Sequence, residues 1–219
     1  MRKEAAMAFH ELRVAYRQGA LDEQAAGGNP LELFMSWIGT ARGTEAILEP
    51  NAMTLATVDA EGRPAARMVL LKEVQDDGAF VFYTNREGRK GAELAGNPHA
   101  ALVFWWEVLE RQVRVEGAVE RTSDAETEAY FDVRPRESRI GAWASHQSRP
   151  IADRAALEQR FQEADAAHPG DDVPVPPWWG GYRVVPSAIE FWQGRTGRMH
   201  DRLRYERTGD RWERTRLQP

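Results

Sequence analysis

The sequence predicts a mainly β fold with helices, of the α+β class, in which an antiparallel sheet of six or seven strands curls into a barrel. The candidate strands follow one another in hairpin order, with helices inserted between some of them. The segment Arg111–Glu120 alternates apolar and polar residues, which is typical of a strand with one face in a core. A doubly wound nucleotide-binding fold is disfavoured because the sequence has neither a Gly-x-Gly-x-x-Gly motif nor a Walker loop.

The N-terminal region predicts helices. Residues Lys3–Arg17 carry an apolar stripe at helical spacing, which predicts a first helix that stops near Gly19. Gly27–Pro30 interrupts this pattern, and a second short helix is expected to begin at or near Pro30. We therefore expect a helical lead-in over residues 1–48 and a barrel domain over residues 49–219.

The remaining elements are predicted from alternation, turn residues and helix caps. Asn85 is expected to cap a helix that runs to Ala95, and Ser123 with Glu126 forms a capping box for a helix that ends near Pro135. A further helix is expected over Ile151–Ala167, followed by a loop rich in Pro and Trp over Pro169–Trp179. Strands are expected at Ala52–Asp59, Ala66–Glu73, Ala79–Thr84, Ala100–Trp106, Arg111–Glu120 and Tyr182–Gln193, with a hairpin over Tyr205–Leu217.

The composition excludes several classes of protein. With 42% hydrophobic and 29% charged residues among 219, the chain is neither a coiled rod nor a disordered tail. It has no cysteine, which excludes disulfides and cysteine nucleophiles and suits a reducing compartment, so we expect a cytoplasmic location. The N-terminus lacks the apolar core of a signal peptide, and the longest apolar run, Ala100–Trp106, is too short to span a bilayer. A net charge of −5 argues against a nucleic-acid partner, and no histidine spacing predicts a metal site.

Two groups of residues are candidates for binding phosphate. Arg86, Arg89 and Lys90 are expected on the first turn of the helix after Asn85, where the helix dipole favours an anion; a solvated basic turn is an equally good interpretation. Tyr130 and Arg134, four residues apart, and Ser138 supply donors that suit a phosphomonoester, although such pairs are also common on surfaces. Arg67 and Lys72 flank an apolar strand and point to opposite sides, and either one alone is more typical of a solvated cation.

The segment Phe191–Arg202 is a candidate for chemistry. It contains an aromatic strand end, two glycines, three arginines and a histidine within twelve positions. A histidine can act as a general acid or base near neutral pH, and an arginine can stabilise a developing negative charge. An exposed basic loop is the alternative interpretation.

Taken together, ordered motifs along the chain resemble the pyridoxamine/pyridoxine 5'-phosphate oxidase family. The resemblance extends from about Leu12 to Pro219, and many motifs at consistent spacing are more specific than any single one. The motifs are Arg67–Lys72, Phe82–Asn85, Arg89–Lys90, Leu109–Val113, Tyr130–Phe131, Arg134–Ser138, Ile140–Trp143, Gln147–Ser148, Trp179–Gly181, Ile189–Gln193, Arg198–Arg202 and Arg216–Pro219.

The resemblance implies an FMN-dependent enzyme with a six-stranded antiparallel split β-barrel, peripheral helices and a homodimer whose active sites lie between subunits. It implies oxidation of pyridoxamine or pyridoxine 5'-phosphate to pyridoxal 5'-phosphate, with O2 as electron acceptor and hydrogen peroxide as a product. Residues 49–219 would then form the FMN-binding oxidase domain, including a C-terminal dimerisation region. A small barrel fills its interior with side chains, so its ligands must bind outside it.

The same resemblance implies roles for individual residues. Those implied to contact FMN are Arg67, Met68, Val69, Leu70, Lys72, Tyr83, Thr84, Arg89, Lys90, Gln112, Gln147, Ser148, Trp192 and Arg202, with Arg67, Thr84 and Lys90 at its phosphate. Those implied to bind substrate are Arg13, Tyr16, Lys72, Tyr130, Arg134, Ser138, Arg198 and His200. Lys72, Tyr130, Arg134 and Ser138 would hold its phosphate. Arg198 and His200 are the implied catalytic residues, which would lie over the pyridine ring and align C4' for hydride transfer to the flavin.

The chain departs from the family near its N-terminus. The family's motif there resembles Arg-Arg-Glu-Tyr, whereas this chain has Arg13-Val14-Ala15-Tyr16, so the contribution of this segment stays open. Two alternatives to the oxidase also stay open: a split-barrel protein that binds flavin or pyridoxal phosphate without oxidase activity, and a different flavin reductase on the same fold. The Arg198/His200 loop and the second phosphate cluster favour the oxidase, because a flavin binder needs neither.

Overall fold

A computed structural model describes residues 15–219, which contain one sheet of nine strands in which every pair is antiparallel. The strands are β1 (Ala52–Val58), β2 (Pro64–Leu70), β3 (Glu73–Val74), β4 (Phe80–Asn85), β5 (His99–Trp106), β6 (Arg111–Arg121), β7 (Trp179–Gln193), β8 (Asp201–Thr208) and β9 (Arg211–Leu217). The α-helices are α1 (Glu23–Ala26), α2 (Pro30–Arg42), α3 (Arg89–Gly96), α4 (Asp124–Asp132), α5 (Arg136–Ala144) and α6 (Arg154–Ala167).

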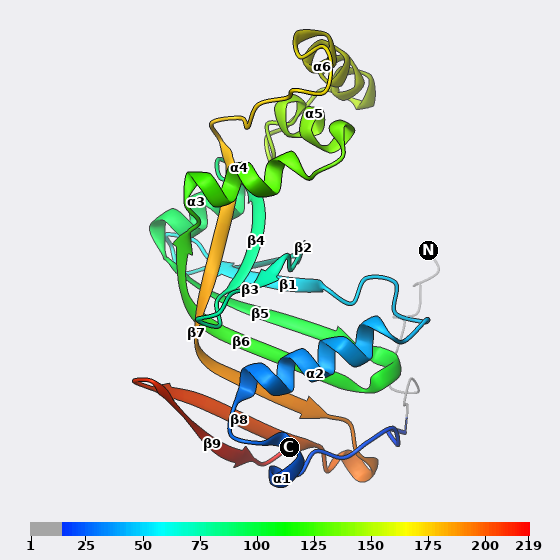
Figure 1. The fold of residues 1–219 in the computed structure, drawn as a ribbon, viewed down its shortest axis with the longest axis vertical. Helices are drawn as coiled ribbons and strands as arrows, with labels where there is room; N and C mark the ends of the chain where they lie inside the picture. The colour runs from blue at the N-terminus through cyan, green and yellow to red at the C-terminus, as the bar shows by residue number, and fades with distance from the viewer. Residues whose placement is uncertain (1–14) are drawn as a thin grey trace, which may run out of the picture.

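The sheet curls because one stretch of chain supplies both of its ends. The strand order is β2-β1-β5-β6-β7-β4-β3, and only Leu71 and Lys72 separate β2 from β3. β2 pairs with β1 while β3 pairs with β4, so the two ends of the path are joined (Figure 1). The predicted α+β barrel with six antiparallel strands is confirmed when β2 and β3 are counted as one strand. The expectation of one continuous strand over Ala66–Glu73 is wrong, since the chain changes partners at Leu71.

The C-terminal strands extend the barrel at one end. β7 pairs with β6 along most of its length, and its other edge pairs first with β4 and then with β8. β8 and β9 form the predicted hairpin, which turns at Gly209 with φ of 62°. The hairpin lies at the opposite end of the molecule from α5 and α6 (Figure 1). β7 begins at Trp179, three residues earlier than predicted, because Trp179–Gly181 pairs with β4.

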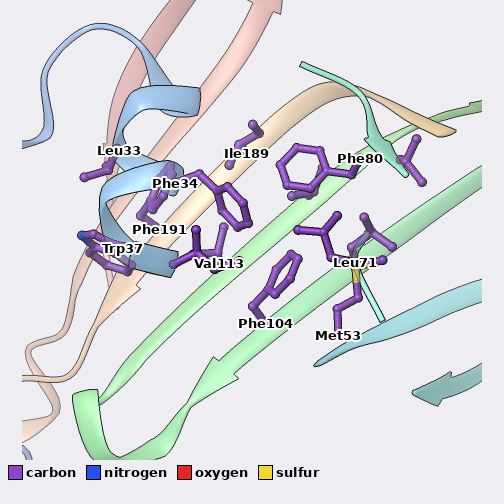
Figure 2. Close-up of a cluster of buried hydrophobic side chains, with 14 of the residues drawn as sticks. Leu33, Phe34, Trp37, Met53, Leu71, Phe80, Phe104, Val113, Ile189 and Phe191 are labelled. Carbon is purple, nitrogen blue, oxygen red and sulfur yellow. The ribbon is translucent and has the colours of Figure 1, made fainter. Parts of the chain in front are cut away.

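Helix α2 covers the core. It begins at Pro30 as predicted, and the Asn29 side chain accepts a hydrogen bond from the backbone N–H of Leu31 at 3.0 Å. Phe34 is 0% exposed, and its ring centroid lies 4.9 Å from that of Phe80 and 5.1 Å from that of Phe104 (Figure 2). The helix therefore shares one core with the barrel strands, and the boundary between residues 1–48 and 49–219 stays a prediction.

The other helices match the prediction in part: α3 and α6 begin later than predicted, α6 at Arg154 instead of Ile151, and α1 was not predicted. The capping box of Ser123 and Glu126 is confirmed at the start of α4. Asn85 is not a helix cap: it ends β4, its Oδ1 accepts from the backbone N–H of Glu87 at 2.8 Å, and α3 begins only at Arg89. The helix α5 was missed altogether. No helix within residues 15–219 has the length and apolar character needed to cross a bilayer.

The described part of the N-terminal segment lies against β8 and β9. The predicted helix over Lys3–Arg17 falls mostly outside the described residues, and its last three, 15–17, are not helical. The backbone N–H of Gln18 donates to Glu110 at 2.9 Å, and that of Leu21 donates to Asp201 at 3.1 Å. The backbone N–H groups of this segment therefore bind carboxylates of other elements. The segment crosses the end of β7, where Gly19 lies beside Gln193.

Candidate active site

A cavity of 610 Å³ lies between strands β2 and β4 and helices α4 and α5. Eleven of its lining residues were assigned to cofactor or substrate from the sequence: Met68, Val69, Leu70, Lys72, Tyr83, Thr84, Lys90, Tyr130, Arg134, Ser138 and Gln147. The other lining residues are Asn85, Pro135, Gly141, Ala142, Ser145 and Trp179. Segments far apart in the sequence therefore bring most of the predicted binding residues to one place.

A buried lysine marks one part of this cavity. Lys90 is 8% exposed, and its ammonium donates to the hydroxyl of Thr84 at 3.1 Å and to Oε1 of Gln147. Thr84 donates to the same Gln147 oxygen at 3.2 Å. A Cβ on Gly88, the residue before α3, would lie only 2.9 Å from that oxygen. An oxygen held by a lysine and a hydroxyl at a helix N-terminus occupies a position that suits an anion.

Arg67 adds a second cation beside Lys90. Burial and then repulsion from Arg67 lower the pKa of Lys90. The Arg67 guanidinium donates to the hydroxyl of Thr57 and to Oε2 of Glu93, the latter at 2.7 Å. Arg67 itself does not line the cavity. An anionic ligand would stabilise two neighbouring cations of this kind.

A second cationic group, together with stacked aromatic rings, faces the same cavity. The rings of Tyr83 and Tyr130 stack at 4.1 Å between centroids, and the Lys72 ammonium lies 5.7 Å from the Tyr130 ring. The Arg134 guanidinium lies 4.7 Å from the ring of Trp179. Its Nη1 atom is buried with no hydrogen-bond partner among the described residues, and burial lowers the pKa of Arg134. An anionic oxygen in the cavity would satisfy that donor.

Three other predicted residues form a row across neighbouring strands. Gln112 on β6 is the register partner of Trp192 on β7, which is the partner of Arg202 on β8. Partner residues in an antiparallel sheet point to the same face. Trp105 on β5 extends the row, is 46% exposed and lies 5.9 Å from Trp192 between ring centroids. The row is a partly exposed surface with two aromatic side chains, which suits contact with a planar ring.

The predicted catalytic residues lie next to this row. The ring of His200 lies 4.6 Å from that of Trp192, and the ring of Tyr16 lies 5.6 Å from each of the two. Arg198 is exposed and has a φ of 61°, a strained conformation for a residue with a side chain. Burial and then the charge of Arg198 lower the pKa of His200. Arg198 and His200 therefore lie on the loop between β7 and β8, whereas Trp192 is on β7 and Tyr16 is on the N-terminal segment.

The two groups of residues do not meet within one chain. The described lining of the 610 Å³ cavity includes none of Gln112, Trp192, Arg198, His200 and Arg202. Two further predicted residues are also absent from that lining: the Arg89 side chain is 62% exposed and pairs with Glu93 at 2.7 Å, and Ser148 is exposed with φ of 70°. Arg13 lies outside the described residues.

Arg86 lies apart from Arg89 and Lys90, because its guanidinium donates to Thr127 at 3.3 Å, so the predicted trio of cations on one helix turn is wrong.

Sequence reasoning missed two residues that line the cavity, Trp179 and Asn85, and one that binds cations beside it, Glu93. Trp179 stacks with Tyr83 at 5.5 Å between centroids and lines the cavity, although it was placed in a loop. Asn85 also lines the cavity and was interpreted as a helix cap. Glu93 is 5% exposed and binds two predicted cations; its spacing of four residues from Arg89 was the available signal.

Comparison with known families gives two matches. The model described as pyridoxamine 5'-phosphate oxidase matches residues 40–168, and the one described as pyridoxine 5'-phosphate oxidase C-terminal dimerisation region matches residues 179–219. The chain is similar to a pyridoxine/pyridoxamine 5'-phosphate oxidase of Thermosynechococcus vestitus, with 58% identity covering 95% of this chain and 98% of the relative. A protein of the same name from Cupriavidus taiwanensis is 54% identical, covering 95% of this chain and 98% of that relative.

Solved structures of similar fold include PhzG from Burkholderia lata 383 in complex with tetrahydrophenazine-1-carboxylic acid. It superimposes with a TM-score of 0.82 at 32% identity, covering 90% of this chain and 95% of the other. A pyridoxamine 5'-phosphate oxidase-related, FMN binding protein from Nostoc punctiforme PCC 73102 has a TM-score of 0.70 at 18% identity, covering 88% of this chain and 100% of the other. At that identity the second likeness concerns the fold alone.

Proposed function

This chain belongs to the pyridoxamine 5'-phosphate oxidase family and is an oxidoreductase, and from that premise we propose that it oxidises pyridoxamine or pyridoxine 5'-phosphate to pyridoxal 5'-phosphate, with FMN as cofactor and O2 as electron acceptor. The observation that carries the proposal is that one cavity is lined by two separate cationic groups, around Lys90 and around Arg134. A cofactor and a substrate that each carry one phosphate need two such groups. The cytoplasmic location predicted from the sequence is part of the same proposal.

The residues around Lys90 suit the phosphate of FMN. The amide oxygen of Gln147 accepts from Lys90 and Thr84, which are the kinds of donor that a phosphate oxygen takes. Arg67 lies close enough to affect Lys90 electrostatically. In this assignment Arg67, Thr84 and Lys90 hold the phosphate, and Met68, Val69, Leu70 and Tyr83 line the cavity beside it.

The residues around Arg134 suit the substrate's phosphate. The unpartnered Nη1 of Arg134 and the ammonium of Lys72 supply charge, and the hydroxyls of Tyr130 and Ser138 supply further donors. Stacking of Arg134 on Trp179 orients the plane of its guanidinium. In this assignment the four residues bind the phosphate, and the pyridine ring of the substrate points toward the cofactor.

The row of Gln112, Trp192 and Arg202 and the loop with Arg198 and His200 supply the other wall of the site. Because these residues do not line the cavity of their own chain, we propose that a second copy of the chain brings them to it in a homodimer. The match of residues 179–219 to a dimerisation region supports this arrangement. A two-fold dimer then forms two equal sites.

FMN, when bound, would supply the redox chemistry: the oxidation of the substrate at C4' and the reduction of O2 to hydrogen peroxide. The alcohol substrate loses two hydrogens, and the amine also takes up water and releases ammonia. The chain's own residues bind, orient and exclude water. Arg198 and His200 position the ring and its 3-hydroxyl; Tyr16, which packs on His200, covers them.

The test is to purify the protein, record its flavin absorbance and add pyridoxine 5'-phosphate in air. The proposal expects bound FMN, pyridoxal 5'-phosphate and an equal amount of peroxide, whereas unphosphorylated pyridoxine at the same concentration should react far more slowly. Bound flavin without product would favour a flavin-binding protein. Failure to take up FMN on reconstitution would contradict the proposal.

A further inference from the structure

A buried carboxylate lies behind the proposed phosphate site and has no role in the function proposed above. Glu93 is on the second turn of α3 and is 5% exposed. Its Oε2 accepts from Arg67 at 2.7 Å and from the hydroxyl of Thr57, which is 1% exposed. Its Oε1 accepts from Nε of Arg89 at 2.7 Å. Both oxygens are therefore occupied by donors of the chain itself.

We propose that Glu93 is a positioning residue that fixes the guanidinium of Arg67 for the phosphate of the cofactor. The inference rests on the proposed function, because it takes Arg67 as a phosphate ligand. Glu93 does not touch the cofactor and acts through Arg67.

The contacts of Arg67 favour positioning over simple neutralisation. Nη2 of Arg67 is held by Glu93, while Nη1 donates to the hydroxyl of Thr57 and, at 3.4 Å, to the backbone oxygen of Leu55. Two nitrogens of a planar group are thus bound to three groups of the barrel and α3, which fixes the plane and leaves little freedom to lose on binding. Arg89, on the exposed side, holds the other oxygen of Glu93 and keeps the carboxylate in place.

The charges around Glu93 are consistent with a phosphate ligand. Burial opposes ionisation of Glu93, but hydrogen bonds from Thr57, Arg67 and Arg89 outweigh it and lower the pKa of Glu93, so the group is charged at neutral pH. With Arg67, Arg89 and Lys90 it leaves two positive charges in excess, close to the charge of about −1.5 to −2 on a phosphomonoester.

Positioning and bulk electrostatics predict opposite results for Glu93→Gln. Removal of a negative charge near a phosphate strengthens binding if only net charge counts. If Glu93 fixes Arg67, the loss of the charged partner frees the guanidinium and weakens FMN binding by about tenfold, the effect of one charge-assisted hydrogen bond. Riboflavin, which has no phosphate to meet Arg67, should bind the variant and the wild-type protein equally well.

The experiment measures dissociation constants of FMN and riboflavin for the full-length apoprotein by quenching of flavin fluorescence. Glu93→Asp, which keeps the charge but shortens the side chain, should also weaken the binding of FMN but not that of riboflavin. It replaces Glu93→Gln in the experiment if that variant does not fold. Glu87→Gln is the matched control, because it removes an exposed carboxylate two residues before α3 and should change neither constant. Thermal unfolding of each apoprotein gives the loss of stability separately.

A double-mutant cycle tests whether Glu93 acts through Arg67. In an Arg67→Gln background, Glu93→Gln should weaken FMN binding by less than about twofold. The inference is overturned if Glu93→Gln leaves the FMN constant unchanged or lowers it, if riboflavin binding weakens as much as FMN binding, or if the full effect persists without Arg67. If the wild-type protein does not prefer FMN to riboflavin, the phosphate site of the proposed function fails instead, and the inference with it.

Discussion

The ring of His200 accepts a hydrogen bond at Nδ1 from the backbone N–H of Arg195, at 3.1 Å. A backbone N–H can only donate, so Nδ1 carries no proton and the neutral ring holds its proton on Nε2. His200 therefore meets a substrate as a donor through Nε2–H. This geometry favours a hydrogen bond to an oxygen such as the 3-hydroxyl group over removal of a proton from C4'.

The first prediction concerns the titration of His200. Burial and the charge of Arg198 hold the pKa of this ring below the ordinary histidine value of 6.5, so NMR titration of the folded protein should give a lower pKa. Arg198→Ala removes the second cause and should raise the pKa of His200 toward 6.5. The His200 resonances are assigned by comparison with the His200→Gln variant. A pKa of His200 at or above 6.5 in the wild-type protein would contradict the prediction.

The same shift has a sign in stability. The unfolded chain binds the proton more readily than the folded one, so the contribution of His200 is complete above pH 6.5 and is lost as pH falls through the folded pKa. The free energy of unfolding, measured in urea, should therefore decrease more steeply between pH 7 and pH 5 for the wild-type protein than for His200→Gln.

The second prediction concerns the backbone of Arg198. Because its φ is 61°, Arg198→Gly relieves strain that Arg198→Ala retains, so the Gly variant should have the higher Tm of the two. Both variants lose the guanidinium, and misalignment of the substrate should lower kcat by about a hundredfold in each, with a smaller change in KM. A kcat that stays at the wild-type value with FMN bound would falsify the role of Arg198.

The third prediction concerns Arg134. Arg134→Lys keeps the charge but loses the planar fork that lies over Trp179 and the buried Nη1 donor. We expect KM for pyridoxine 5'-phosphate to rise about tenfold while kcat at saturation changes by less than about threefold. Arg149→Gln, an exposed change, is the control. Equal losses in kcat and in FMN affinity would show that Arg134 does not serve the substrate's phosphate.

The fourth prediction concerns the core beneath α2. Phe34 is 0% exposed and packs against other aromatic rings, whereas its neighbour Met35 is 55% exposed. Phe34→Ala should lower the free energy of unfolding by about 3–5 kcal/mol, and Met35→Ala should change it by less than about 0.5 kcal/mol. Urea denaturation followed by tryptophan fluorescence measures both. Similar values for the two would mean that α2 does not pack on the barrel as described.

Local patterns predicted most of the fold. The alternation of β6 was confirmed, with Val113 and Val115 both 0% exposed, and the capping box of Ser123 predicted the start of α4. Features that depend on tertiary partners were missed. The division of the second strand at Leu71 follows from pairing with β1 and β4, and α5 has an unremarkable local sequence after Pro135.

The candidate site could be predicted only in part, for a similar reason. The residue types around Lys90 and Arg134 were apparent, but their convergence on one cavity depends on segments more than 50 residues apart, such as Thr84 and Gln147, whose bond spans 63 positions. Asn85 was assigned to a cap because its side chain suits both a cap and a turn. Glu93 received no role from the sequence, because its burial depends on tertiary contacts such as the hydrogen bond from Thr57 on β1.

The last prediction concerns the separation of Arg134 from Arg198. Arg134 lines the cavity, whereas Arg198 lies on the loop after β7, outside that lining. If a homodimer joins the two, each site takes Arg134 from one subunit and Arg198 from the other. Homodimers of Arg134→Gln and of Arg198→Ala should both be nearly inactive. Unfolding and refolding an equal mixture should form mixed dimers in half of the cases, and each has one intact site, so about a quarter of wild-type activity should return. Mixing could not restore a site that is contained within one subunit. If mixed dimers are demonstrated and activity still does not return, the shared site is ruled out.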